Sequence, residues 1–134
     1  MSAMNIKATK ENTGDVLDFV TAELEKNNFP SNLHSDILVA AEEIFVNIAN
    51  YAYKPELAGE VTITSNVANE AEFTFEDMGK TFNPLENAAP DLNSPLAERK
   101  VGGLGLHLVK SLTDKMEYRR DGNKNILTFT KGRE

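Results

Sequence analysis

The chain has 134 residues, of which 40% are hydrophobic and 26% are charged, a balance that fits one soluble domain with one hydrophobic core. Its 21 acidic and 14 basic residues give a formal net charge of −7, which disfavours unaided binding to nucleic acid because phosphates would be repelled at long range. The absence of cysteine excludes disulfides, zinc–thiolate sites and thiol nucleophiles, and two histidines are too few for a histidine-based metal cluster.

No signal for a membrane span or for secretion is visible in the sequence. No apolar run approaches the roughly 20 residues that a membrane-spanning helix needs. Residues 1–7 lack the apolar centre of a signal peptide, and no helix pattern shows the lysine-rich face of a membrane-surface helix. We therefore expect one cytoplasmic domain over residues 1–134, without membrane association.

The first half of the chain predicts a strand followed by two helices. Residues 5–11 form a candidate edge strand, and residues 15–28 carry apolar side chains at helical spacing, namely Val16, Phe19, Val20 and Leu24. We expect a longer helix over residues 31–53, with Ser31 or Asn32 as its N-cap. One broad face of that helix is apolar and consists of Ile37, Ala41, Ile44, Phe45, Ile48 and Ala52. Residues 54–59 then form a turn.

The middle of the chain predicts a hairpin followed by an irregular segment. Apolar and polar residues alternate over Val61–Ser65 and over Glu72–Glu76, which predicts two strands joined by a turn at Asn69-Glu70. Residues 83–100 show no clear period and contain Pro84, Pro90 and Pro95, three of the five prolines. An irregular segment of this length in a compact domain is usually functional or disordered.

The last third predicts a helix and a second hairpin. A helix over residues 103–116 places Leu104, Leu108, Val109, Leu112 and Met116 on one stripe. Residues 116–120 and 125–131 then pair around a turn at Asp121-Gly122-Asn123. The order of elements predicts an α+β fold, a two-layer sandwich in which three helices cover one face of a mixed, mostly antiparallel sheet.

Three polar residues share one stripe of the second predicted helix. Glu43, Asn47 and Asn50 are spaced i, i+4, i+7 and lie opposite the centre of the apolar face. A solvated outer face would explain them. Asparagine is, however, a mediocre helix former, because its side chain competes for backbone hydrogen bonds. The presence of two asparagines beside the large apolar residues Phe45, Val46 and Tyr51 therefore favours a functional role for the carboxamide side chains.

The second candidate element is Asp77-Met78-Gly79, which follows the strand of Phe73 and Phe75. A carboxylate at the end of a strand can accept a hydrogen bond from an exocyclic amine such as that of adenine, and Gly79 lets the backbone pass close to a flat ring. A plain Asp-x-Gly turn is the alternative. Phe82 and Pro84 can fix the turn by packing.

The third element is the loop Gly102-Gly103-Leu104-Gly105-Leu106 before the last predicted helix. Glycines allow close approach of a bound group, and a helix N-terminus attracts phosphate. The alternative is a glycine-rich entry to a tightly packed helix. The loop lacks the Lys-Ser/Thr ending of a P-loop and the preceding strand of a Rossmann turn. Arg99 and Lys100 can pair with phosphates or remain exposed charges. For His107 a surface or half-buried position is favoured over a catalytic one.

Together the three elements resemble the N, G1 and G2 boxes of the GHKL ATPase superfamily. Within that superfamily the chain resembles the small anti-sigma-factor serine/threonine kinases of bacterial partner-switching systems. Residues 43–53 resemble their N box, 76–84 their Asp-x-Gly-x-x-Phe-(Asn/Asp)-Pro form of G1, and 102–106 their G2. The match covers nearly the whole chain in the right order. Two departures are Tyr51, where the family often has histidine, and Thr81, where it often has proline.

The resemblance implies ATP and Mg²⁺ as the bound groups and a role for each box. Asn47 would coordinate Mg²⁺, and Glu43 would be the general base towards a serine or threonine hydroxyl, or towards water. Asp77 would bind the adenine amino group, with Gly79 beneath the ring. Residues 83–101 would form the ATP lid. The remaining residues expected at the nucleotide are Asn50, Phe82, Arg99, Lys100, Gly102, Gly103, Leu104, Gly105 and Leu106, with Gly103 and Gly105 presenting backbone N–H groups to the phosphates.

The implied function is that of an anti-sigma protein kinase that phosphorylates a STAS-type antagonist protein and sequesters a sigma factor or another regulator. A non-catalytic ATP-binding switch that selects a partner needs the same pocket and stays open, as does a structural domain without a ligand. The length leaves no room for the dimerisation helix pair of a histidine kinase or for the transducer domain of gyrase-like proteins. A homodimer rests on the resemblance alone, and the sequence does not identify the partner.

Overall fold

The computed structural model describes residues 1–52, 59–79 and 108–133, without the side chains of 51 and 52. Its strands are β1 (Ser2–Lys7), β2 (Glu60–Val67), β3 (Glu70–Asp77), β4 (Lys115–Asp121) and β5 (Lys124–Gly132). Its helices are α1 (Thr13–Lys26) and α2 (His34–Asn47), and residues 108–112, where the last described range begins, are also helical. Two 3₁₀ turns, η1 (Lys10–Asn12) and η2 (Ser31–Leu33), precede the main helices, and a π-helical turn, η3 (Ile48–Ala52), follows α2.

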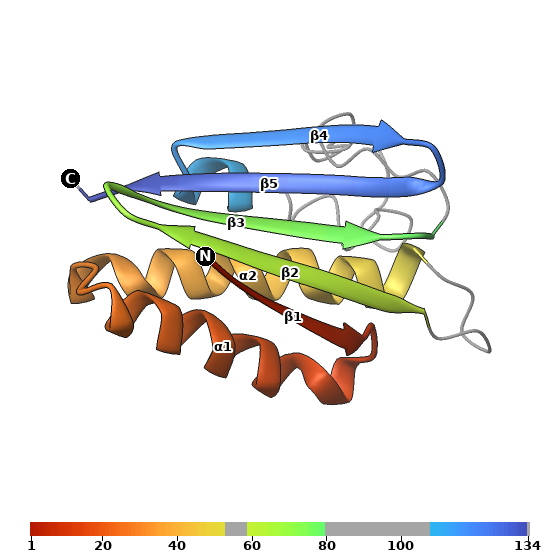
Figure 1. The fold of residues 1–134 in the computed structure, drawn as a ribbon, viewed down its shortest axis with the longest axis horizontal. Coiled ribbons are helices and arrows are strands. Elements are labelled where there is room, and N and C mark those ends of the chain that lie inside the picture. The colour runs from red at the N-terminus through yellow and green to blue at the C-terminus, as the bar shows by residue number, and fades with distance from the viewer. Residues whose placement is uncertain (53–58, 80–107, 134) are drawn as a thin grey trace, which may run out of the picture.

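The strands form one sheet in the order β1-β2-β3-β5-β4, and every pairing in the described part of the chain is antiparallel. β4 therefore lies at the edge, and the chain crosses past β5 to reach it. Figure 1 shows α1 and α2 side by side along the sheet, and both helices contact strands of it. The predicted α+β two-layer fold is confirmed, and its sheet is fully antiparallel across the described strands.

One face of the sheet and the helices form the core. In β2 and β3, buried residues alternate with more exposed ones, so that Val61, Ile63, Phe73 and Phe75 face the helices. The ring of Phe129 on β5 stacks with those of Phe73 and Phe75, with centroids 5.7 and 6.4 Å apart. The helices add fully buried residues to the same cluster: Val16, Val20 and Leu24 from α1, and Ile37, Ala40, Ala41, Ile44 and Phe45 from α2.

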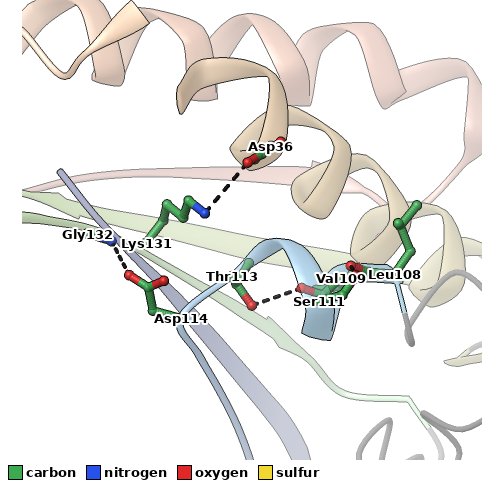
Figure 2. Close-up of polar contacts among 8 residues, drawn as sticks. All are labelled: Asp36, Leu108, Val109, Ser111, Thr113, Asp114, Lys131 and Gly132. Atoms are coloured by element: carbon green, nitrogen blue, oxygen red, sulfur yellow. Dashed lines mark hydrogen bonds and ion pairs between the residues drawn. The ribbon is translucent and has the colours of Figure 1, made fainter. Parts of the chain in front are cut away.

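The last helix ends earlier than its sequence pattern predicts. Helical structure stops at residue 112, and Met116 lies in β4 opposite Phe129. The reason is a pair of bonds to β5. The Asp114 carboxylate accepts the backbone N–H of Gly132 (Figure 2), at 2.6 Å, and the Asp114 N–H donates to the backbone carbonyl of Thr130 at 2.9 Å. These bonds start the β4–β5 pairing. Two neighbouring residues of the predicted apolar stripe differ in burial, because Leu108 is 42% exposed whereas Val109 is fully buried.

Several other boundaries differ from the predictions. The N-cap assignment to Ser31 or Asn32 was wrong, because η2 precedes α2 and Leu33 is its N-cap, without a side-chain cap hydrogen bond. β1 begins at Ser2 and ends at Lys7, before the predicted end at residue 11. The turn between β2 and β3 is at residues 68–69, since Glu70 already belongs to β3. The predicted turn over 54–59 lies outside the described residues except for Gly59.

The final hairpin follows its turn sequence closely. Asp121 pairs with Lys124 across the two turn residues, Gly122 and Asn123. Gly122 has φ of +62°, which a glycine adopts without steric cost, and this conformation suits a tight two-residue hairpin turn. The turn fixes the register that places Arg120 opposite Asn125. Residues near the turn are thereby brought to the end of β3.

Candidate nucleotide-binding site

The C-terminal half of α2 and the end of β3 lie at the same end of the molecule. Both elements run towards that end in Figure 1, and they contact each other. β5 begins there, because it is antiparallel to β3 and places Asn125 opposite Asp77. The fold therefore brings Asn47, Asp77 and Asn125 to one end of the helix–sheet layer.

Asn47, the last residue of α2, is buried, with 4% of its surface exposed. Its Nδ2 donates to the backbone carbonyl of Glu43 at 2.6 Å, so the amide nitrogen is engaged by its own helix. Its Oδ1 is buried without a hydrogen-bond partner in the part of the chain that the structure describes. A solvated outer face, the alternative raised from sequence, is therefore wrong for Asn47.

The unpaired oxygen of Asn47 fits a divalent cation. A buried polar atom without a partner loses its hydration and gains nothing in return, so such atoms are rare and call for an explanation. An amide oxygen is a hard donor of the kind that Mg²⁺ takes, usually together with phosphate oxygens and water. The donor present at this position thus matches the metal that the family resemblance implies.

Glu43 lies one helical turn before Asn47 and is half-buried. Burial raises the pKa of its carboxyl group above the usual value, and the neighbouring charge of Glu42 raises it further. A carboxylate with a raised pKa is a stronger base, provided that it is still ionised at the working pH. The position and the pKa of Glu43 are thus suited to accepting a proton beside the Asn47 site.

The turn that follows Asn47 is π-helical, and this was not predicted from sequence. η3 spans Ile48–Ala52 and continues directly from α2. π-helical turns are rare in proteins, and those that do occur are often found at functional sites. Asn50 lies in this turn and is exposed, so it does not share the buried environment of Asn47.

Asp77, the last residue of β3, is also buried, with 6% of its surface exposed. Its Oδ1 accepts two hydrogen bonds at 2.9 Å, from the backbone N–H of Gly79 and from Nδ2 of Asn125. Burial raises the pKa of Asp77, while these two bonds and the charge of Arg120 oppose the rise. The bond to Gly79 closes the Asp-x-Gly turn, as the sequence alternative foresaw, but the bond to Asn125 goes beyond a plain turn.

Sequence reasoning missed the residues that surround Asp77. Asn125 is 4% exposed and accepts hydrogen bonds from Tyr118 at 2.6 Å and from Arg120 at 3.1 Å. Arg120 also donates to the backbone carbonyl of Gly79 at 2.9 Å. One signal was available: Asn125 is a polar residue at an inward position of a strand whose other inward positions include Leu127 and Phe129.

Part of the predicted site lies outside the described residues. This holds for Phe82, Arg99 and Lys100, for the glycine loop 102–106, for the lid over 83–101 and for His107. The described site therefore consists of Glu43, Asn47, Asp77 and Gly79, with Asn50 nearby on η3. No helix among the described residues is long and apolar enough to cross a membrane.

Comparisons with known proteins identify the family of the chain. The profile of the histidine kinase-like ATPase domain matches residues 6–131. The chain belongs to this family. The match to this histidine kinase-like ATPase family confirms the resemblance inferred from the three boxes, and it covers the elements that carry Glu43, Asn47 and Asp77.

Curated relatives within this ATPase family are protein kinases by name. Serine/threonine-protein kinase BtrW of Bordetella bronchiseptica is 23% identical over 128 residues, which are 95% of this chain and 90% of that protein. Serine-protein kinase RsbW of Halalkalibacterium halodurans is 28% identical over 133 residues, 96% of this chain and 80% of that protein.

Solved structures show the same fold. A crystal structure of the RsbU and RsbW domains of Rv1364c from Mycobacterium tuberculosis matches 98% of this chain with a TM-score of 0.68 and 14% identity, and this chain covers 32% of that one. The mycobacterial sensor histidine kinase MprB matches 96% of this chain and 97% of its own with a TM-score of 0.53 and 14% identity. At these identities the likeness establishes the fold of the domain.

Proposed function

We propose that this chain is an ATP-dependent protein serine/threonine kinase that acts as an anti-sigma regulatory factor and phosphorylates a STAS-type antagonist protein. The observation that carries the proposal is the buried, unpartnered Oδ1 of Asn47 one turn from the half-buried carboxyl group of Glu43. A structural domain without a ligand would have no use for such an atom. The names of the kinase relatives BtrW and RsbW support the same reaction.

The roles follow from the chemistry of each side chain. Asp77 accepts a hydrogen bond from the 6-amino group of adenine, and Gly79 allows the backbone to lie beneath the ring. Asn47 holds Mg²⁺ through Oδ1, and the metal, when bound, neutralises charge on the phosphates. We propose that Asn50, Phe82, Arg99, Lys100 and residues 102–106 complete the nucleotide site, and that residues 83–101 form a lid over it.

In the transfer step, the hydroxyl oxygen of the partner's serine or threonine forms a bond to the γ-phosphorus of ATP. The bond between that phosphorus and the β–γ bridging oxygen breaks, and ADP leaves with the electron pair. Glu43 accepts the hydroxyl proton. Phosphoryl transfer depends on positioning and charge neutralisation more than on covalent catalysis, so few side chains are needed.

The partners are proposed by the same reasoning from the family resemblance. A STAS-domain protein would be the phosphate acceptor, and a sigma factor or another regulator would be sequestered, with a homodimer as the assembly. A switch that binds ATP without transferring phosphate is the second function to test. It would need Asn47 and Asp77 but not a proton acceptor at position 43.

The experiment is transfer of radiolabelled phosphate from ATP to STAS-domain proteins of the same genome, in the presence of Mg²⁺. We expect labelling by the wild-type chain and none by Glu43→Gln, while Glu43→Gln still binds ATP. Glu25→Gln, on the exposed side of α1, is the matched control and should label normally. Regulation that persists in Glu43→Gln would favour the non-catalytic switch. ATP binding without labelling of any STAS protein would contradict the kinase assignment.

A further inference from the structure

A hydrogen-bond network, buried at Asp77 and Asn125 and more exposed at Tyr118 and Arg120, joins Asp77 to the β4–β5 hairpin. Oδ1 of Asn125 accepts hydrogen bonds from the hydroxyl of Tyr118 at 2.6 Å and from Nη1 of Arg120 at 3.1 Å. An amide oxygen that receives two donors cannot be exchanged with the amide nitrogen without losing both bonds. Nδ2 of Asn125 is thereby fixed towards Asp77, to which it donates at 2.9 Å.

Arg120, on the edge strand β4, makes two further hydrogen bonds to backbone carbonyls. The same Nη1 donates to the backbone carbonyl of Gly79 at 2.9 Å, and Nε donates to the carbonyl of Gly122 at 3.2 Å. One guanidinium group thus links the turn after β3, the β4–β5 turn and Asn125. Lysine presents a single ammonium point charge and cannot reproduce this planar arrangement of donors.

The consequence for Asp77 is that its two oxygens differ. Oδ1 is filled by Gly79 and Asn125, and none of the described residues donates to Oδ2. An ionised carboxylate only accepts hydrogen bonds, so the second oxygen can pair with an amino group but not with a carbonyl oxygen. The positive charge of Arg120 favours the ionised form of Asp77.

We propose that Arg120 and Asn125 are positioning residues that hold Asp77 with one acceptor oxygen towards the base and thereby set the preference for a 6-aminopurine over a 6-oxopurine. The inference rests on the proposed function, in which Asp77 binds adenine. Both residues act through Asp77 and Gly79. Discrimination by a buried group that must be paired is typically stronger than discrimination by packing, because the wrong base leaves the group unpaired.

The test compares dissociation constants of the full chain for ATP and for inosine triphosphate, which carries a carbonyl oxygen in place of the 6-amino group. We expect Arg120→Ala to weaken ATP binding roughly 10-fold, as for loss of a hydrogen bond that supports a charged group, with little change for inosine triphosphate. The Kd for inosine triphosphate divided by the Kd for ATP should therefore fall in Arg120→Ala. In Arg120→Lys this ratio should fall by a smaller factor. Arg119→Ala is the matched control, because Arg119 is exposed and pairs only loosely, at 3.6 Å, with Asp121.

The ratio of the two dissociation constants separates positioning from general damage. A merely structural role would weaken both nucleotides equally in Arg120→Ala and leave the ratio unchanged, which would overturn the inference. If Arg120→Ala does not fold, an unchanged ratio in Arg120→Lys would overturn it as well. A wild-type chain that binds neither nucleotide would contradict the proposed function itself. A wild-type preference for ATP that survives both substitutions would contradict only the role of Arg120.

Discussion

Asn47 donates its amide N–H to the backbone carbonyl of Glu43 at 2.6 Å, and this bond determines which atom of Asn47 remains for a ligand. The nitrogen is bound by the helix, so the buried oxygen is the atom without a partner. The same helical turn carries the carboxyl group of Glu43. The proposed metal ligand and the proposed proton acceptor are thereby held by one helix.

We predict that Asn47→Ala retains the stability of the free protein but loses nucleotide binding. The lost bond to Glu43 is offset by removal of an unsatisfied buried oxygen, so the free energy of unfolding should stay within about 1 kcal/mol of wild type. Nucleotide at about 100 times its dissociation constant should add about 2.7 kcal/mol to the wild type and nothing to the variant. Urea denaturation with and without ATP and Mg²⁺ measures both quantities. The exposed Asn66→Ala is the control, and a destabilised variant that still responds to nucleotide would contradict the prediction.

The pH dependence of phosphate transfer should report the pKa of Glu43. Glu43 must be ionised to accept a proton, so the rate falls as the pH drops through its pKa, which burial and then the charge of Glu42 raise. Glu42→Gln removes the second cause and should move this acid limb to lower pH without abolishing activity. Rates measured across the acidic range test this, and an acid limb that stays in place in Glu42→Gln would argue against Glu43 as the base.

Asp77→Asn should increase the stability of the free protein at neutral pH. Burial raises the pKa of Asp77 in the folded state, so between the unfolded and folded pKa values the folded state binds more protons, and stability falls as the pH rises. Asparagine can accept the same bonds from Gly79 and Asn125 without an ionisable group. The difference between variant and wild type should disappear below the unfolded pKa of aspartate. Urea denaturation at neutral and acidic pH decides this, and a variant less stable than wild type at pH 7 would contradict it.

Ser65→Ala should lower the free energy of unfolding at a position away from the site. The stability that Ser65 supplies should be lost as the pH falls, whereas the stability linked to Asp77 falls as the pH rises. Ser65 Oγ donates to the buried carboxylate of Glu23 at 2.5 Å and is the largest cause that lowers the pKa of Glu23. Loss of a bond to a buried charge costs about 1.5–3 kcal/mol. This contribution is present above the unfolded pKa of Glu23 and is lost as the pH falls through its folded pKa. Chemical denaturation at a neutral and an acidic pH measures this loss of stability, with the exposed Ser35→Ala as control. An equal loss at both pH values would refute the prediction.

Local sequence patterns predicted much of the fold. They also singled out Asn47 and Asp77, both of which are buried in the structure. Alternation at Val61, Ile63, Phe73 and Phe75 follows directly from the pleat of a strand, so the central strands could be recognised. Asp77 at the end of such a strand was identified for the same reason.

Features that depend on distant parts of the chain were not predicted. The network of Tyr118, Arg120 and Asn125 depends on β4 lying at the edge beyond β5, which no local pattern determines. The end of the last helix depends on the contact of Asp114 with Gly132 across the sheet. The burial of Asn47 depends on what packs around α2, which helical periodicity does not reveal.

We propose that Mg²⁺ and an adenine nucleotide bind between the end of α2 and the end of β3. The decisive measurement is a crystal structure with a non-hydrolysable ATP analogue and Mg²⁺. We predict that the adenine amino group lies within hydrogen-bond distance of Asp77 and that the metal is bound by Oδ1 of Asn47. A nucleotide bound elsewhere, or an Asn47 oxygen paired with protein side chains and remote from the phosphates, would contradict the account.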